Sequence, residues 1–323
     1  MKLIQILTLG VIALAITSCV SSGTEKSISE LNSKLVFKIR FQNSLGLNFY
    51  YAGCSTRNLG GLERMCQYSE ANPSDLTFQI GPAFSYLLHE ESSSTELRSK
   101  RKVLWEIFKV QKVQFYSVDW LDLVPSLKLF EESHRGSSIS LVSSNIKKGE
   151  QYLFEPYLIK EIAGKKVGII ALSEDSQKKN REGWRVETQE AAFKKISSQI
   201  QEKVELFFLV GRVPELMRKR LSEISSKPIL FFGGGLMENN TTQLISEGSR
   251  VGFIKSPDFG NGFGELVLGR DQELAGASVQ SEIAGWFLSF SAKLLKPVPV
   301  KFNACSQILK SAEPNSFPVE GIK

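Results

Sequence analysis

YLFEPYLIKEIAGKKVGIIALSED, residues Tyr152–Asp175, carries the clearest structural pattern in the chain. It contains two β-rich runs, Tyr157–Ile162 and Val167–Leu172, on either side of Ala163-Gly164-Lys165. Because glycine readily reaches the positive φ of a tight turn, the pattern predicts a β-hairpin. The first run mixes polar and apolar residues, as a half-solvated strand does. The second is continuously apolar, which predicts a strand buried on both faces and central in a sheet.

Length and composition indicate a soluble globular protein. The chain has 323 residues, of which 42% are hydrophobic and 23% are charged, so it can bury one large core or two modest ones. The formal net charge is +6 and the isoelectric point is about 9.0. Such a charge could suit an anionic partner, but the lysines are scattered along the chain. We therefore interpret the excess as a solvated basic surface and expect no nucleic-acid partner.

The N-terminus has the pattern of an export signal. Met1-Lys2 is followed by the apolar run Leu3–Ile16, which is too short to span a bilayer comfortably. The run ends in Ile16-Thr17-Ser18-Cys19, which resembles the bacterial lipobox. We predict a signal peptide over residues 1–18, lipidation of Cys19 with palmitate among the acyl chains, and a flexible tether over residues 19–34. The protein would then be anchored in the bacterial cell envelope, at the outer membrane. Ordinary secretion with Cys19 as a spare thiol is the alternative.

Strand and helix patterns alternate on both sides of the hairpin, which indicates an α/β fold. We expect the Arg-Lys run of the basic helix at Leu97–Val110 to lie on a face that is exposed to solvent. Strands are expected at Leu35–Phe41, Leu76–Pro82, Ile139–Asn145, Val204–Arg212 and Pro228–Phe232, and helices at Leu97–Val110, Leu127–Ser133, Glu187–Lys203, Arg212–Ile224 and Ser281–Lys296. Gly260–Gly264 is interpreted as a hairpin turn into the last strand, and residues 296–323 as a proline-punctuated tail.

The hairpin block closely resembles the middle of calcineurin-like metallophosphatase domains, in particular the 5′-nucleotidase branch, where a "py.ike.gG.kvGiigl" segment recurs. Gly60-Gly61-Leu62-Glu63-Arg64 resembles the GGLAR that opens the family's first helix, and Ile139–Asn145 resembles its "vlsANv" strand. The resemblance covers about Leu35 to Gly269. It implies a four-layer α/β/β/α sandwich with two facing mixed sheets over residues 35–270, followed by a C-terminal helix and tail over residues 271–323.

The same resemblance implies a metal site that has lost its ligands. The family binds two divalent metal ions through aspartate, asparagine and histidine side chains at strand ends. Only Asn43 fits its pattern here, and proline or glycine offers no side-chain ligand. The corresponding positions are Asn43, Ser44 and Gly46 for "T-N-D-x-H-G", Pro82 for "lDAGD", Asp119 and Trp120 for "GNHE", Gly211 for "vlLsH", and Gly235 and Met237 for "lGHxH". We expect no metal cofactor and no catalytic residue, while Asp119 and Ser44 could still serve a ligand pocket.

The function expected from these patterns is that of a pseudoenzyme lipoprotein. It would have a binding or structural role toward an unknown small molecule or protein partner. One alternative is an active 5′-nucleotidase-like phosphohydrolase that uses two divalent metal ions, and another is an unrelated α/β ligand-binding lipoprotein. A two-metal site needs converging histidines and carboxylates. The chain has two histidines, His89 and His134, and both lie in polar stretches typical of a surface.

The remaining cysteines predict a disulfide without fixing its partners. If Cys19 is lipidated, Cys54, Cys66 and Cys305 remain in an exported protein. A Cys54–Cys66 bridge would close a short loop and stabilise the fold by up to about 3 kcal/mol. Cys305 would then be unpaired, or it is itself a partner, and the sequence leaves both open. The spacing typical of a zinc site is absent.

Overall fold

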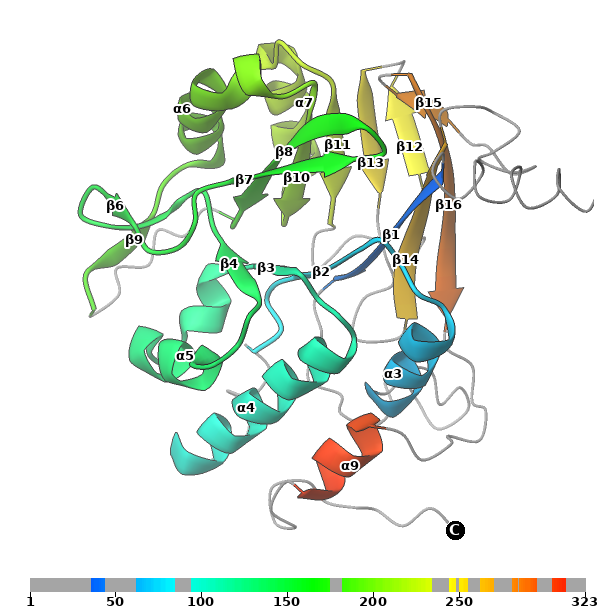
Figure 1. Ribbon diagram of the computed structural model, residues 1–323. Coiled ribbons are helices and arrows are strands. Elements are labelled where there is room, and N and C mark those ends of the chain that lie inside the picture. Colours follow the sequence, from blue (N-terminus) through cyan, green and yellow to red (C-terminus); the bar gives the residue numbers. More distant parts are fainter. Residues whose placement is uncertain are drawn as a thin grey trace, which may run out of the picture.

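The computed structural model describes residues 36–43, 62–84, 94–174, 182–233, 244–247, 250–254, 262–269, 281–283, 285–294 and 304–311. Two β-sheets face each other across an apolar core, and helices cover their outer sides (Figure 1). Both sheets contain parallel and antiparallel pairs. The predicted four-layer α/β/β/α sandwich with two facing mixed sheets is confirmed.

The first sheet has seven strands. β1, β2, β3 and β4 run parallel, so their carboxyl ends share one edge, whereas β14 and β16 extend the sheet in antiparallel fashion beside β1. In order across the sheet the strands are β15 (Ser281–Ile283), β16 (Trp286–Leu294), β14 (Gly262–Gly269), β1 (Val36–Asn43), β2 (Leu76–Ile80), β3 (Phe115–Ser117) and β4 (Ser140–Val142).

The second sheet has six strands. Its middle four strands are parallel, with an antiparallel strand at each edge. The order is β12 (Leu244–Glu247), β13 (Val251–Ile254), β11 (Ile229–Phe232), β10 (Leu206–Gly211), β8 (Lys165–Leu172) and β7 (Leu158–Ile162). A small third sheet lies beside them, in the order β6 (Gln151–Tyr152), β5 (Ile146–Lys148) and β9 (Trp184–Val186).

The predicted hairpin is β7 and β8. These strands pair antiparallel up to Ile162 and Lys165, which leaves Ala163-Gly164 as a two-residue loop. Both loop residues have positive φ, 46° at Ala163 and 76° at Gly164, as a type I′ turn requires. Val167–Leu172 is buried throughout, and β8 lies between β7 and β10. The prediction of an interior strand is therefore confirmed.

The helices cover the sheets on opposite sides of the molecule (Figure 1). On the side of the seven-stranded sheet lie α3 (Leu62–Ala71), α4 (Ser94–Val110), α5 (Leu127–His134) and α9 (Ala304–Ser311), and on the side of the six-stranded sheet lie α6 (Gln189–Ile200) and α7 (Glu215–Ile224). Side chains of Ser126 and Thr188 accept backbone hydrogen bonds at the starts of α5 and α6. Short 3-10 helices, η2 (Trp120–Leu123) and η3 (Gln201–Lys203), complete the described elements.

The expected helix at Ser281–Lys296 is wrong. Residues 281–283 and 286–294 form β15 and β16, and residues 287–294 of β16 pair with the whole length of β14. Trp286 and Leu288 are buried in the core between the sheets, which is the alternation of a strand with one face inward. A short apolar run is compatible with the helical period of 3.6 residues and with the strand period of two residues. The pairing with β14 shows that it forms a strand. The sheet thus continues beyond the expected boundary at residue 270, and β14 is not its last strand.

The C-terminal segment and the cysteines also differ from expectation. Cys66 on α3 forms a disulfide with Cys305 on α9, with the two Cα atoms 6.2 Å apart. Cys66 is therefore not available for a bridge to Cys54, and Cys305 is a partner, which is the other pairing that the sequence left open. Cys54 lies outside the described residues. The reason lies in the tertiary structure: α9 packs against α3 and α4, which brings Cys305 beside Cys66 of α3. The proline-punctuated tail thus contains a docked helix.

The Arg-Lys run of α4 is less exposed than expected. Arg101 is fully buried, donates a hydrogen bond from Nη2 to the carbonyl of Val124 at 2.6 Å, and lies over the ring of Phe84. Lys100 is buried as well. His134 is half-buried against Trp105, which corrects the expected surface position, while His89 lies outside the described residues.

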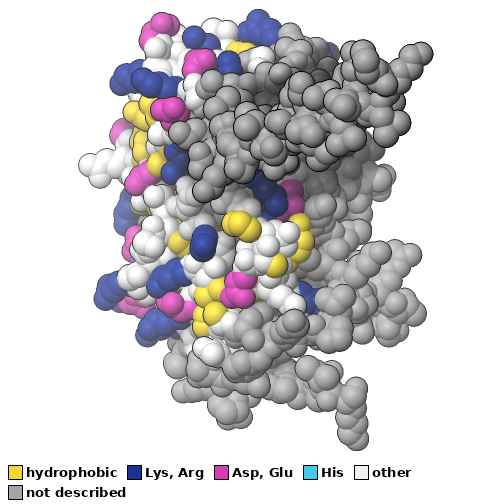
Figure 2. All heavy atoms as spheres, turned by 45° about the vertical axis from the view of Figure 1, so that its right-hand side comes forward, with side chains coloured by type: hydrophobic (Ala, Val, Ile, Leu, Met, Phe, Trp, Pro, Cys, Tyr) yellow, Lys and Arg dark blue, Asp and Glu magenta, His cyan; other side chains and the backbone are white. Residues whose placement is uncertain are grey.

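The described side chains on one face of the molecule are mixed in charge. On the face seen in Figure 2, basic and acidic side chains are interspersed and small hydrophobic groups lie between them. Among the helices that the structure describes, none is long and apolar enough to cross a bilayer.

A buried ion-pair cluster at the strand ends

The carboxyl ends of β3, β8 and β10 meet between the two sheets. The Ser117 hydroxyl at the end of β3 lies 3.5 Å from the carbonyl oxygen of Val210 in β10. The residues that follow these strands are polar: Asp119, Ser173 and Arg212. Side chains at the ends of parallel strands converge on one edge of a sheet, which is where open α/β folds place their sites.

Arg212 and Asp119 form the centre of this cluster. Arg212 Nε donates to Asp119 Oδ2 at 3.0 Å, and Arg212 Nη2 donates to Asp119 Oδ1 at 3.1 Å. Both residues are buried, with 4% and 3% of their surface exposed, so the pair is shielded from water. Two parallel charge-assisted bonds fix the guanidinium in the plane of the carboxylate. The third nitrogen, Nη1, lies 3.2 Å from the half-exposed carboxylate of Glu174.

A ring of neutral groups holds the pair in place. The Ser173 hydroxyl donates to Asp119 Oδ2 at 3.1 Å and accepts the backbone N–H of Trp120 at 3.0 Å. Gln189, at the start of α6, donates to the carbonyls of Ser173 and Arg212. The cluster therefore ties β3, β8, β10 and α6 together. It joins the two sheets at the edge where the resemblance implies metal ligands.

A second buried carboxylate, Asp122, organises the loop after β2. Its Oδ1 accepts the backbone N–H groups of Ala83 and Phe84 at 2.9 and 3.0 Å. Its Oδ2 accepts the Tyr116 hydroxyl at 2.8 Å and the N–H of Asp119 at 3.0 Å. Burial and the nearby charge of Asp119 raise the pKa of Asp122 to about 7, although these hydrogen bonds act in the opposite direction.

Two glycines show that the backbone itself leaves no room for side chains at this edge. Gly211 has φ 132°, and a β-carbon on it would lie 2.1 Å from the carbonyl oxygen of Leu172. Gly233, at the end of β11, has φ 150°, and its β-carbon would lie 2.0 Å from the carbonyl oxygen of Gly211. Both contacts are with backbone, which cannot rotate away. A histidine at Gly211 could not be accommodated unless the strand moved.

The structure brings some of the predicted site residues together. Asp119 is the central carboxylate, Trp120 opens η2 beside it, and Gly211 directly precedes Arg212. Pro82 follows Gly81 through a cis peptide bond, next to the Asp122 loop. Asn43 is buried at the end of β1. Ser44, Gly46, Gly235 and Met237 lie outside the described residues, as does Cys19.

Sequence reasoning missed the residues that complete the cluster. They are Arg212, Ser173, Glu174, Gln189 and Asp122. A signal for Arg212 existed, because an arginine directly after a continuously apolar strand must either reach water or find a buried partner. Nothing in the sequence indicated which carboxylate it pairs with.

The described residues at this edge do not fit a pair of divalent metal ions. The fixed positive charge of Arg212 lies against both oxygens of Asp119, which would otherwise be the hard ligands. Within the described ranges, no three side chains of histidine, cysteine, aspartate or glutamate are grouped so that they could hold a metal ion.

Comparisons with known proteins identify the fold. No family model and no curated protein sequence matches the chain. Among solved structures, a 5′-nucleotidase precursor from Thermus thermophilus superposes with a TM-score of 0.64 at 13% identity, over 86% of this chain and 58% of that one. The sulfate thiohydrolase SoxB of the same organism gives 0.63 at 12% identity, over 85% and 60%.

A shorter protein matches over almost its whole length. The calcineurin-like phosphoesterase YfkN from Bacillus subtilis superposes with a TM-score of 0.58 at 14% identity, over 87% of this chain and 98% of that one. For the two Thermus proteins, by contrast, this chain covers less than two thirds of their length. At these identities the likeness shows the fold alone, and this fold is the one found in calcineurin-like phosphoesterases and 5′-nucleotidases.

Proposed function

We propose that the protein is a lipid-anchored lipoprotein of the bacterial cell envelope whose phosphoesterase-like domain acts by binding or as a structural element, without catalysis. The observation that carries this proposal is the bidentate Arg212–Asp119 pair at the strand ends. A two-metal phosphoesterase requires open coordination positions that generate a hydroxide and hold the phosphate. A guanidinium whose N–H donors already bind carboxylates offers no coordination position for a metal-bound hydroxide and no free donor for a phosphate.

The cluster is also a poor receptor for a free anion. All three guanidinium nitrogens of Arg212 face protein carboxylates, from Asp119 and Glu174. A phosphate would have to displace one of them, and the Asp119 interaction is almost fully shielded from water. The cluster therefore supports a role in holding the two sheets together, and a ligand or partner would bind at another surface.

Metal content and hydrolysis test the absence of catalysis. We expect the protein purified with excess Mn²⁺ or Zn²⁺ to hold less than one ion per chain. We also expect it to leave AMP and bis(p-nitrophenyl) phosphate unhydrolysed. Stoichiometric binding of two ions, together with turnover that disappears on chelation, would instead establish the active phosphohydrolase, the alternative that the fold of the Thermus nucleotidase favours.

The anchor is tested through Cys19. Two or three acyl chains hold a protein stably at a membrane, whereas one chain binds only marginally. We expect the intact protein to partition into the detergent phase and to incorporate labelled palmitate, and Cys19→Ala to lose both properties. Cys54→Ala is the matched control, and it should behave as the parent protein does. Palmitate labelling that survives Cys19→Ala would contradict the anchor.

A further inference from the structure

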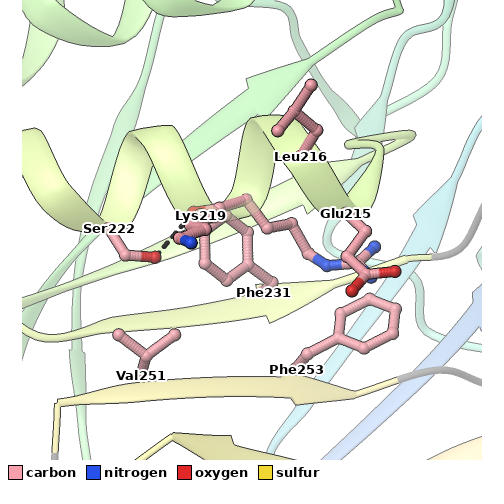
Figure 3. Close-up of a pocket in the computed structure, with 8 residues that line it drawn as sticks. Glu215, Leu216, Lys219, Ser222, Phe231, Val251 and Phe253 are labelled. Carbon is pink, nitrogen blue, oxygen red and sulfur yellow. Dashed lines mark hydrogen bonds between the residues drawn. The ribbon is translucent and has the colours of Figure 1, made fainter.

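A second candidate site lies on the outer side of the six-stranded sheet. It is a pocket of about 530 Å³ between helix α7 and strands β11 and β13 (Figure 3). Sites for small organic ligands typically have volumes of about 300–1,000 Å³. None of its lining residues belongs to the strand-end cluster. A role for this pocket is therefore independent of the proposed function.

The strand side of the pocket is apolar. Phe231 of β11 and Phe253 of β13 are register partners in neighbouring parallel strands, so their rings lie on the same face of the sheet. Val251 lines the same side, two residues before Phe253. Phe231 is 1% exposed, whereas Val251 and Phe253 remain half-buried. Figure 3 shows these three side chains directed toward α7. The apolar part of a ligand could therefore cover the surface of Val251 and Phe253 that is still in contact with water.

The helix side carries an excess of positive charge. Lys219 is exposed at the wall, and Arg218 lies with its guanidinium carbon 3.7 Å from the ring centroid of Phe253. Glu215 is the one acidic residue among those lining the pocket. The Arg218 side chain is also bonded to the carbonyl of Val213. Among the residues that line the pocket, Lys219 is therefore the cation that is exposed and available to an anionic group.

We propose that this pocket binds a small amphiphilic anion, which has a single carboxylate or sulfonate on an apolar chain or ring. The apolar part lies against the half-buried Val251 and Phe253, and the anionic group lies at Lys219. Pockets of this type combine a predominantly apolar lining with a few polar groups that fix the orientation of the ligand. Such a ligand matches both sides of the pocket, whereas a purely apolar or purely ionic one matches a single side.

Calorimetric titration of the full-length protein with decanoate, below its critical micelle concentration, tests the proposal. We expect one saturable site per chain with a dissociation constant on the order of 0.1 mM. Decan-1-ol, which lacks the charge, should bind about fivefold more weakly, as is typical for the loss of an exposed ion pair. Lys219→Gln should weaken decanoate about fivefold and leave decan-1-ol unchanged. The control Lys203→Gln alters an exposed lysine of η3 outside the pocket and should change neither.

Two further variants test the apolar part. Phe253→Ala should weaken both ligands about tenfold, because it removes a large share of the apolar contact. Ser222→Trp should block the pocket and abolish binding, which keeps the test decisive if the first variant is poorly folded. The proposal is overturned if decanoate shows no saturable binding, if Lys219→Gln or Ser222→Trp leaves its affinity unchanged, or if only vesicles of anionic lipid bind.

Discussion

At the scale of single residues, the buried Arg212–Asp119 pair is an interaction on which the stability of the fold is expected to depend strongly. A buried ion pair is weak evidence for net stabilisation, but removal of one partner leaves an uncompensated buried charge. Among the described residues, Arg212 would keep the half-exposed Glu174 as its counter-charge. The two carboxylates around this guanidinium are therefore unequal, because one is buried and the other is in contact with water.

Asp119→Ala should lower the free energy of unfolding by about 3 kcal/mol. Glu174→Ala removes the exposed partner of the same arginine and should lower it by less than about 1 kcal/mol. Urea denaturation of both variants measures the difference. Equal effects of the two substitutions would contradict the assignment of Asp119 as the central partner.

Asp122 gives the stability a dependence on pH. Burial raises its pKa in the folded protein from 3.8 to about 7, so the folded state holds this proton over a range in which the unfolded state has lost it. Its contribution to stability is therefore greatest at low pH and falls as pH rises from about 4 to about 7. Asp122→Asn should remove this slope from the unfolding free energy measured between these values. Glu202→Gln, an exposed control on η3, should leave the slope as it is.

At the scale of secondary-structure elements, the end of β10 depends on the absence of a side chain. Gly211 and Gly136 both have positive φ, 132° and 84°. A β-carbon on Gly211 meets the carbonyl oxygen of Leu172 at 2.1 Å, whereas one on Gly136 meets nothing within 4 Å. Substitution of the two glycines by alanine therefore separates the free-energy cost of an unfavourable φ, which both share, from the cost of a backbone clash, which occurs at Gly211 alone.

Gly211→Ala should therefore lower the unfolding free energy by more than about 3 kcal/mol, and Gly136→Ala by about 1 kcal/mol. Thermal or chemical denaturation checks both values. For the same reason, Gly211→His should not create a metal site, because the strand has to move before the imidazole fits. If Gly211→Ala were no more costly than Gly136→Ala, the close approach of β8 and β10 would be wrong.

The sequence predicts elements whose evidence is local. The β7–β8 hairpin was predictable because its turn and both strands lie within one short stretch. A helix is predicted at Ser281–Lys296 because a short apolar run is compatible with both the helical and the strand period. Only the pairing with β14, which is not local, shows that this segment is a strand. The candidate site depends on still longer-range relations. Asp119 and Arg212 are 93 residues apart, so no spacing rule could join them. The family resemblance located the strand ends but not the groups that now occupy them.

At the scale of the whole molecule, the Cys66–Cys305 disulfide connects α3 to α9 across 239 residues. In the chain-entropy model, a crosslink that closes so long a loop stabilises a fold by about 5 kcal/mol, although native disulfides range below this value. The bridge is therefore among the strongest single constraints on the described fold.

Cys66→Ala/Cys305→Ala should lower the unfolding free energy by about 2–5 kcal/mol under oxidising conditions. A reductant should lower the stability of the parent protein by a similar amount and leave the double variant unaffected. Cys54→Ala is the control and should cost little. Peptide mapping without reduction should recover a fragment that joins Cys66 to Cys305, and a Cys54–Cys66 fragment in its place would contradict the pairing.

The same disulfide determines how the molecule would respond to mechanical force. When it is intact, a pull between Val36 and Ser311 passes through β1 and α3, crosses the sulfur–sulfur bond at Cys66, and leaves through α9. Residues 67–304, which the bond encloses and which include the whole six-stranded sheet, lie outside this covalent path of the force. Reduction would release about 800 Å of additional contour length at roughly 3.5 Å per residue. A domain tethered at one end and held by a partner at the other would thus extend only at its margins while oxidised.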